Sequence, residues 1–290
     1  MLEKKFVVLP NKETYAYLDQ GEGEIFLLIH GNLSSSLHFL PLFNRMKNVR
    51  LVAPDMRGFG DSSYINSFSS LLELAKDVKM FADVVGISGA HVVGWSTGGG
   101  VGFELAAKYA EFVKSLFIIE GVGYNGYPLL KKKADGTYEP FATREELADD
   151  PAVKPLAASL VEKNESFMNM IWEASIYTGN KPSPEENKIY IAETLKQRNL
   201  IDTDLALAKF NMSGEHNGYT KGSGDIGNIR CPVAFTCGEL DLLIPPATSR
   251  ANAAVISGSK LLEYQKCGHS PMVDCPDRLV ADILANAGVR

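Results

Sequence analysis

One stretch of the chain reads His91-Val92-Val93-Gly94-Trp95-Ser96-Thr97-Gly98-Gly99-Gly100, and in it a short apolar run ends on a serine flanked by glycines. A helical pattern begins directly afterwards. Residues 94–98 match G-x-S-x-G, in which a strained turn after a strand lifts a serine hydroxyl clear of the sheet. Small residues are needed two positions either side because strand and helix approach too closely there for a Cβ atom. The stretch therefore predicts a strand, a sharp turn and a helix, with Ser96 as the candidate nucleophile.

Composition limits what kind of protein this is. The chain has 290 residues, of which 45% are hydrophobic and 22% charged, as expected for a globular protein with a large core. We expect one domain with an insertion rather than two equal domains. The net charge of -6 argues against a nucleic-acid or anionic-membrane partner, which would need clustered Lys and Arg. The only such run, at residues 131–133, is interpreted as a solvated loop.

The same composition bears on location. No apolar run approaches the roughly 18 residues of a membrane span. The apolar segment near the N-terminus is too short for a signal peptide and is interpreted as the first strand. The four cysteines form no C-x-x-C pair, a pattern typical of reduced thiols. The sequence therefore predicts a cytoplasmic enzyme, as a monomer or homodimer.

Strand and helix signals alternate on both sides of the serine. Residues 6–9 and 14–18 predict an antiparallel hairpin, and the unbroken apolar run at residues 25–29 is typical of a strand buried on both faces. Alternating strands and helices predict a mostly parallel sheet whose ligands bind beyond the C-terminal ends of the strands. His30, Ser96 and Glu120 all follow or end such strands.

Between residues 121 and 228 the pattern changes to helix signals without a convincing strand. Thr143-x-x-Glu146 and Ser183-x-x-Glu186 are capping boxes, and residues 167–177 predict another helix. A run of helices inserted into an alternating pattern is interpreted as a lid. We therefore expect a core domain of residues 1–120 and 229–290 and a helical cap of residues 121–228.

The candidate nucleophile needs two partners elsewhere in the chain. A serine hydroxyl is a weak nucleophile near neutral pH, so it requires a base within hydrogen-bonding reach and a third group that orients this base. Asp241 and His269 each lie in a loop directly after a predicted strand. The order Ser, acid, His is the order expected for this type of turn.

Five separated motifs together resemble the serine hydrolases of the α/β-hydrolase superfamily, in the order of that family. They are His30-Gly31, Asp55-x-Arg57-Gly58-x-Gly60-x-Ser62, the G-x-S-x-G turn, Gly238-x-x-Asp241 and Gly268-His269. The resemblance implies an α/β-hydrolase fold: a mostly parallel eight-stranded sheet with helices on both faces and an inserted helical lid. It also suggests that Asp55 and Arg57 pair beneath the site and that His30 braces the loop it begins.

The resemblance implies a role for each site residue. Ser96 would attack a carbonyl carbon, His269 would take and return its proton, and Asp241 would hold the imidazole. The backbone N–H groups of Asn32 and Thr97 would form the oxyanion hole. Water activated by His269 would release the acyl enzyme, so no metal or organic cofactor is needed.

The identity of the acid has one competitor. Glu120 ends the strand after the serine, where some members of the superfamily carry the acid instead. We favour Asp241 because the residues that follow it, Leu242-Leu243-Ile244-Pro245, complete the motif of the family.

The substrate pocket is less well defined by sequence. Trp95, beside the nucleophile, is either packing or pocket wall. Met168 and Trp172 belong to a set of apolar lid residues that either line an acyl pocket or pack the lid against its own core. As a set, they favour an apolar site roomy enough for an acyl chain.

The leading hypothesis is hydrolysis of a small-molecule carboxylic ester with an apolar acyl group. Alternatives with the same triad are a lactonase, a thioesterase, an intracellular polyester depolymerase and a C–C hydrolase. A hydrolase-like receptor that closes its lid on a ligand is an alternative of a different class. Haloalkane dehalogenases and epoxide hydrolases need an aspartate in place of Ser96. A dehydrogenase is excluded because no G-x-G-x-x-G follows a strand.

Overall fold

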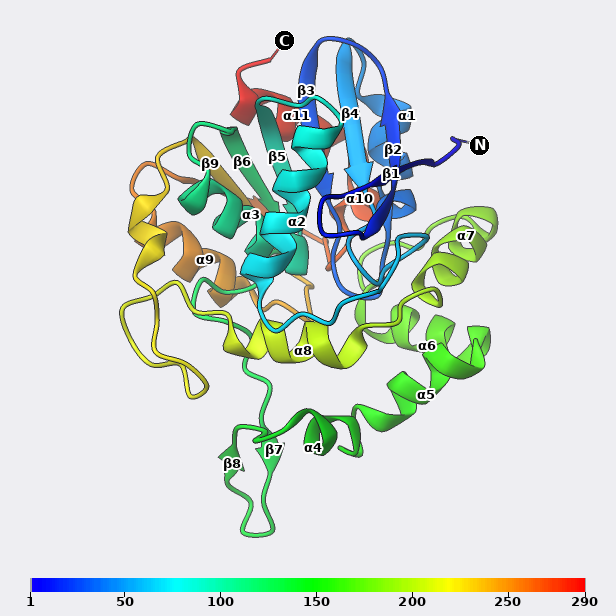
Figure 1. Ribbon diagram of the computed structural model, residues 1–290, viewed down its shortest axis with the longest axis vertical. Helices are drawn as coiled ribbons and strands as arrows, with labels where there is room; N and C mark the ends of the chain where they lie inside the picture. The colour runs from blue at the N-terminus through cyan, green and yellow to red at the C-terminus, as the bar shows by residue number, and fades with distance from the viewer. Residues whose placement is uncertain (1, 290) are drawn as a thin grey trace.

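Eight strands form one sheet in the computed structural model, which describes residues 2–289 (Figure 1). Their order across the sheet is β1-β2-β4-β3-β5-β6-β9-β10. The bounds are β1 (Lys5–Val8), β2 (Thr14–Gln20), β3 (Glu24–Ile29), β4 (Val49–Pro54), β5 (Ala90–Trp95), β6 (Val113–Ile119), β9 (Val233–Gly238) and β10 (Lys260–Tyr264). The β1–β2 and β2–β4 pairings are antiparallel, and the others in this sheet are parallel. The predicted hairpin and mostly parallel eight-stranded sheet are confirmed.

Helices cover both faces of this sheet. They are the 3-10 helix η1 (Ser36–Phe39), α1 (Leu40–Arg45), α2 (Leu71–Val84), α3 (Thr97–Lys108), α9 (Pro246–Val255), α10 (Pro271–Asp274) and α11 (Pro276–Ala287). Along β3, Leu27 and Ile29 join the core shared with α2 and α3, whereas Phe26 and Leu28 join the core shared with α1 and α11. A strand that contributes to two cores must be apolar at successive positions, which explains the unbroken apolar run of β3.

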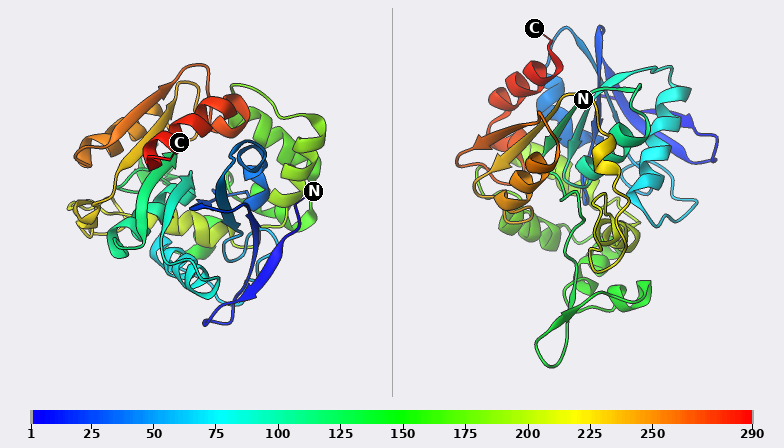
Figure 2. Two further views of the ribbon diagram at one scale, coloured as in Figure 1. Left: turned by 90° about the horizontal axis from the view of Figure 1, so that it is seen from above. Right: turned by 90° about the vertical axis from the view of Figure 1, so that its left-hand side faces the viewer.

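Most of the segment between β6 and β9 lies below the sheet in Figure 1 and in the right-hand view of Figure 2, and its last part, near residue 225, lies beside α3. It contains β7 (Lys131–Lys132), β8 (Tyr138–Glu139), α4 (Arg144–Ala148), α5 (Lys154–Glu162), α6 (Glu165–Ser175), α7 (Pro184–Thr194), α8 (Leu200–Lys209) and the 3-10 helix η2 (Asp225–Asn228). Between residues 2 and 289, no helix is both long enough and apolar enough to cross a membrane.

The expectation that this segment contains no strand is wrong, because β7 and β8 form a small antiparallel hairpin. Asp135 Oδ1 accepts the Thr137 N–H at 2.9 Å, and Gly136 has a φ of 84° that favours glycine in the turn. Lys131, expected in a solvated loop, lies in β7 and pairs with Glu139 at 3.0 Å. Strands of two residues are too short to show an alternating pattern in the sequence.

The sequence predicts capping boxes at two helices of this segment. The capping box predicted at the start of α7 is confirmed, because Ser183 and Glu186 each accept the backbone N–H of the other. At α4 only half of the predicted box forms. Thr143 accepts the Glu146 N–H at 3.1 Å, but the Glu146 carboxylate accepts the Ala142 N–H and contacts Lys131 instead.

Candidate active site

Ser96 lies on a strained turn between β5 and α3. Its φ of 54° and ψ of -117° are rare for a residue with a side chain. A Cβ atom at Gly94 would lie 2.3 Å from the carbonyl oxygen of Gly98, and one at Gly98 would lie 2.1 Å from that of Ile29. Only glycine fits at both positions, so the spacing seen in the sequence has a steric cause. The predicted strand, sharp turn and helix are confirmed.

Asp241 and His269 form a buried pair at the ends of β9 and β10. His269 Nδ1 lies 2.7 Å from Asp241 Oδ2, and the two residues are 2% and 5% exposed respectively. Asp241 Oδ1 accepts the N–H groups of Leu243 and Ile244 at 2.8 and 2.9 Å. These backbone contacts fix the carboxylate, and the carboxylate in turn orients the imidazole. The indole N–H of Trp95 also donates to the His269 carbonyl at 2.8 Å.

Ser96 and His269 line one cavity, but within residues 2–289 no hydrogen bond joins the Ser96 hydroxyl to the imidazole. Such contacts are often long in the absence of substrate and tighten in the reacting complex. The loop after β3 passes directly beside the serine, because a Cβ atom at Gly31 would lie 2.9 Å from Ser96 Cβ. Three separated loops therefore meet at this cavity.

The predicted oxyanion residues flank the serine. Thr97 is the first residue of α3, where the helix dipole favours negative charge, and Asn32 follows Gly31. In the described part of the chain, neither backbone N–H donates to another protein group. Both N–H groups are therefore available to an oxygen atom bound in the cavity.

Residues of the inserted segment hold the loop that carries Asn32. Gln197 Nε2 donates to Asn32 Oδ1 at 2.7 Å, and Asn32 Nδ2 donates to Asp204 Oδ1 at 3.0 Å. The Leu33 N–H donates to Gln197 Oε1 at 2.8 Å, and Thr194 Oγ1 donates to the Leu33 carbonyl at 2.6 Å. The sequence does not indicate these residues, because contacts between polar residues more than 160 positions apart leave no local pattern.

His30 braces the same loop, as the resemblance suggested. Its side chain is fully buried, and Nε2 accepts the Met56 N–H at 2.9 Å while Nδ1 lies 2.8 Å from the Gly31 carbonyl. Burial lowers the pKa of His30 to about 4, so the ring is neutral near pH 7. A neutral ring can accept from one backbone group and donate to another, which suits it to a bracing role.

Glu120 is buried at the end of β6 near Asp241. Its carboxylate accepts the Thr236 hydroxyl at 2.6 Å and the Gly238 N–H at 3.0 Å. Burial, reinforced by the negative charge of Asp241, raises the pKa of Glu120 to about 8. Glu120 is therefore mostly protonated near pH 7. Asp241, and not Glu120, is the acid hydrogen-bonded to His269.

The cavity above Ser96 has a volume of about 250 Å³ and is mainly apolar. Trp95 and Trp172 both line it, together with side chains of the segment between β6 and β9 such as Leu129, Leu156, Ile171 and Leu207. Met168 does not line it. This methionine is fully buried in the core beneath α6, so its expected contact with substrate is corrected to a packing role.

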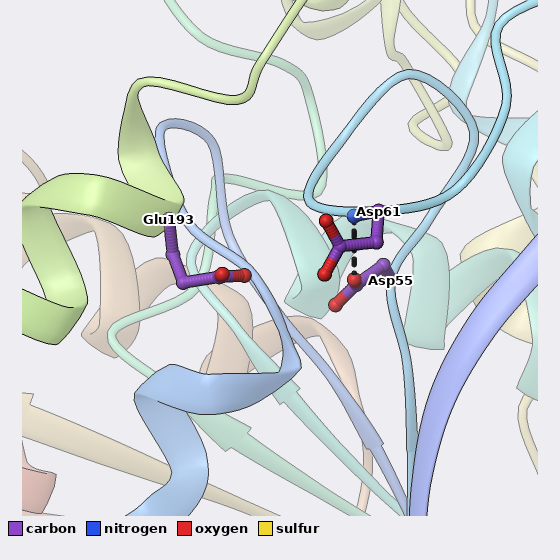
Figure 3. Close-up of side chains that lie close together, drawn as sticks. All are labelled: Asp55, Asp61 and Glu193. Atoms are coloured by element: carbon purple, nitrogen blue, oxygen red, sulfur yellow. Dashed lines mark hydrogen bonds between the residues drawn. The ribbon is translucent and has the colours of Figure 1, made fainter. Parts of the chain in front are cut away.

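A second group of carboxylates, drawn in Figure 3, does not line the cavity. Asp55 and Asp61, in the loop after β4, and Glu193, on α7, have oxygen atoms within 4.8 Å of one another, as metal ligands would. Lys4 Nζ lies 2.8, 2.8 and 2.7 Å from these three carboxylates. The ammonium group already supplies the positive charge, so the cluster is a salt-bridge network.

This arrangement corrects the expectation that Asp55 and Arg57 pair. Asp55 pairs with Lys4 and accepts the N–H groups of Ser36 and Asp61. Arg57 instead pairs with Asp77 of α2 at 2.7 Å. Two side chains two positions apart in a turning loop can point to different elements, which spacing alone does not reveal.

Comparison with known proteins agrees with the observed fold. The family model described as alpha/beta hydrolase fold matches residues 24–276. Lipase 1 of Psychrobacter immobilis is 25% identical over 280 residues, which cover 95% of this chain and 81% of that protein. The 2-hydroxymuconate semialdehyde hydrolase of Pseudomonas putida is 28% identical over 283 residues, with 93% and 90% covered. The esterase EaEST from Exiguobacterium antarcticum has a TM-score of 0.73 at 17% identity, over 99% of this chain and 100% of that chain.

Because the family model covers most of the chain, the protein belongs to the alpha/beta hydrolase fold family. The structural neighbour confirms the fold, including the sheet with helices on both faces. The fold that the five motifs imply is therefore correct.

Proposed function

We propose that this chain is a carboxylic ester hydrolase that uses Ser96, His269 and Asp241 and acts on a small ester with an apolar acyl group. The observation that carries the proposal is the buried His269–Asp241 pair, at 2.7 Å, on the cavity that also receives Ser96 from its strained turn. Relatives named lipase and neighbours named esterase support the same class.

The proposed reaction begins with attack of Ser96 Oγ on the carbonyl carbon. The hydroxyl proton passes to His269 Nε2, and Asp241 stabilises the imidazolium that forms. The carbonyl oxygen becomes an oxyanion between the N–H groups of Asn32 and Thr97. Each such donor is worth about a hundred- to a thousandfold in rate.

Collapse of this intermediate breaks the bond to the alcohol, which leaves with the proton from His269 Nε2. The acyl group stays on Ser96 Oγ. His269 then takes a proton from water, the resulting hydroxide attacks the acyl carbon, and the acid is released as Ser96 regains its proton. Atoms and charges balance with water as the only co-reactant, so the proposal requires no metal or organic cofactor.

The size and lining of the cavity narrow the substrate. A volume of about 250 Å³ is slightly below the range of roughly 300–1,000 Å³ that holds drug-sized ligands, so small esters with short or medium acyl chains fit best. Within residues 2–289 no Lys or Arg lines the cavity. A carboxylate substrate, such as the one in the name of the Pseudomonas putida relative, is therefore less favoured than a neutral ester.

A panel of p-nitrophenyl esters, with acyl chains from two to twelve carbons, tests this proposal. We expect turnover that is highest for short and medium chains and falls to the background rate in Ser96→Ala. A fluorophosphonate should label Ser96, and His269→Ala should slow the labelling strongly. Labelling at equal rates would reject His269 as the base. Ester turnover no greater than in Ser96→Ala would favour the receptor alternative.

Assays with other substrate classes separate the remaining alternatives. Lactones, thioesters, polyester oligomers and C–C substrates can be offered at matched chain length, and preferred turnover of one of them would replace the ester assignment. We further propose that residues 121–228 act as the lid over the cavity. The cytoplasmic location and the monomeric or dimeric state stay predictions.

A further inference from the structure

The cavity contains one carboxylate that the proposed reaction does not use. Asp204, on α8, lines it together with the side chains of the proposed active site. Asp204 Oδ1 accepts the Asn32 side-chain N–H at 3.0 Å. Within the described residues, the Asp204 side chain forms no other hydrogen bond. In that part of the chain Asp204 forms no salt bridge. By contrast, Asp202, two positions earlier on α8, pairs with Arg144.

A carboxylate that lines an apolar cavity without a cationic partner costs free energy, because its charge is removed from water. Burial raises the pKa of Asp204 to about 7, and the hydrogen bond from Asn32 offsets this only in part. An apolar residue or an amide of similar size would avoid the cost of removing a charge from water. The position of Asp204 therefore suits a ligand that brings the missing positive charge.

The rest of the lining points to the same kind of ligand. Trp95, Trp172 and Tyr127 line the cavity with aromatic rings, whose faces attract cations. His269 also lines the cavity, and its partner Asp241, a second carboxylate, is buried behind the imidazole and outside the lining. No Lys or Arg of residues 2–289 lines the cavity to balance these negative charges. A bound cation would meet attraction from the carboxylates and the rings, and a bound anion would meet repulsion.

We propose that Asp204 binds a protonated amine carried by the substrate, so that the preferred substrates are small amino esters. This inference deepens the proposed function and rests on it for turnover, but the binding itself can be measured separately. The apolar lid residues hold the hydrocarbon part, Asp204 fixes the ammonium group, and the ester carbonyl is left to reach Ser96.

Intrinsic fluorescence provides a test that does not depend on turnover. The chain has two tryptophans, Trp95 and Trp172, and both line the cavity. In the Ser96→Ala variant, pentylammonium, 1-pentanol and pentanoate are titrated at pH 8, where the Asp204 carboxylate is mostly ionised and the amine is protonated. We expect pentylammonium to bind at least tenfold more tightly than pentanol, and pentanoate to bind least.

A matched pair of variants identifies the carboxylate. Adding Asp204→Asn should weaken pentylammonium binding at least tenfold and change pentanol binding less than twofold, since asparagine keeps an oxygen that can accept from Asn32. Adding Asp202→Asn instead removes a nearby carboxylate that does not line the cavity, and should leave all three affinities within twofold.

Two outcomes would overturn the inference. Equal binding of pentylammonium and pentanol to Ser96→Ala would show that the cavity does not select a cation. Equal loss of both ligands in Asp204→Asn would show that Asp204 only supports the structure. If the amine preference appears but neither an ester of the p-nitrophenyl panel nor an amino ester of matched chain length is hydrolysed, the proposed function fails while the ammonium site stands.

Discussion

Asp241→Asn is the sharpest test of the proposed triad, because it keeps the shape of the side chain and removes its charge. Asp241 Oδ1 accepts the backbone N–H groups of Leu243 and Ile244. An asparagine must keep its oxygen on these two donors, since its own NH₂ group cannot accept from them. The NH₂ group then faces His269 Nδ1, which lies 2.7 Å from the replaced oxygen.

That contact would put the imidazole in the wrong tautomer. His269 Nδ1 must accept from the asparagine, so the single ring proton of the neutral imidazole moves to Nε2, which can no longer take the proton from Ser96. In a serine protease the same change with intact geometry lowers kcat about ten-thousandfold. We expect kcat for p-nitrophenyl butyrate to fall about 10³- to 10⁴-fold, or about 4–5.5 kcal/mol, with little change in KM.

Glu120→Gln is the matched control. Glu120 is mostly protonated near pH 7 because burial raises its pKa to about 8, and glutamine has the shape and charge of the protonated acid. We expect kcat to stay within about threefold of the original chain. Both variants are assayed at pH 7 under saturating ester, with folding checked by circular dichroism. A large loss in Glu120→Gln with a small loss in Asp241→Asn would refute the argument and transfer the role of the acid to Glu120.

Two further predictions concern stability. Lys4→Met removes the ammonium group from three carboxylates, two of which are buried. The free energy of unfolding, measured in urea at pH 7, should fall by about 3–5 kcal/mol. A change below about 1 kcal/mol would contradict the role of the network. The raised pKa of Glu120 means that the native chain retains a proton that the unfolded chain loses above about pH 4.5. The contribution of Glu120 to stability therefore falls as the pH rises from about 4.5 to 8. Between pH 5 and pH 8 the free energy of unfolding of Glu120→Gln should rise relative to that of the original chain, and a constant difference would contradict this.

The core of the fold was predictable because each of its constraints leaves a short pattern in the sequence. Steric exclusion of Cβ atoms at Gly94 and Gly98 leaves a five-residue pattern, and burial on both faces leaves an unbroken apolar run in β3. The placement of Asp241 and His269 after strands followed from the same logic, since parallel strands end at one edge of the sheet. Some of these constraints come from distant segments, as at Gly98 beside Ile29, but each leaves a pattern in the spacing of a few consecutive residues.

The features that sequence did not reveal depend on which surfaces meet. A helical pattern in α6 shows that Met168 and Trp172 are buried, but both packing against the core and lining the cavity satisfy it, and only Trp172 lines the cavity. Arg57 likewise pairs with Asp77 because the position of α2 brings Asp77 next to Arg57. Contacts between elements far apart in the chain are set by the tertiary structure, and no local periodicity encodes them.

The loop after β3, which carries Asn32, shows what such contacts imply for the proposed lid. Asn32 and Leu33 are held by Thr194, the last residue of α7, and by Gln197 in the loop between α7 and α8, while Glu193 joins α7 to the core through Lys4. Moving this half of the inserted segment away from the sheet would break those hydrogen bonds and release the backbone that carries one proposed oxyanion donor. We therefore infer that the α7–α8 half of the proposed lid stays fixed as a wall of the candidate active site, and that any motion that admits substrate occurs in the part from β7 to α6.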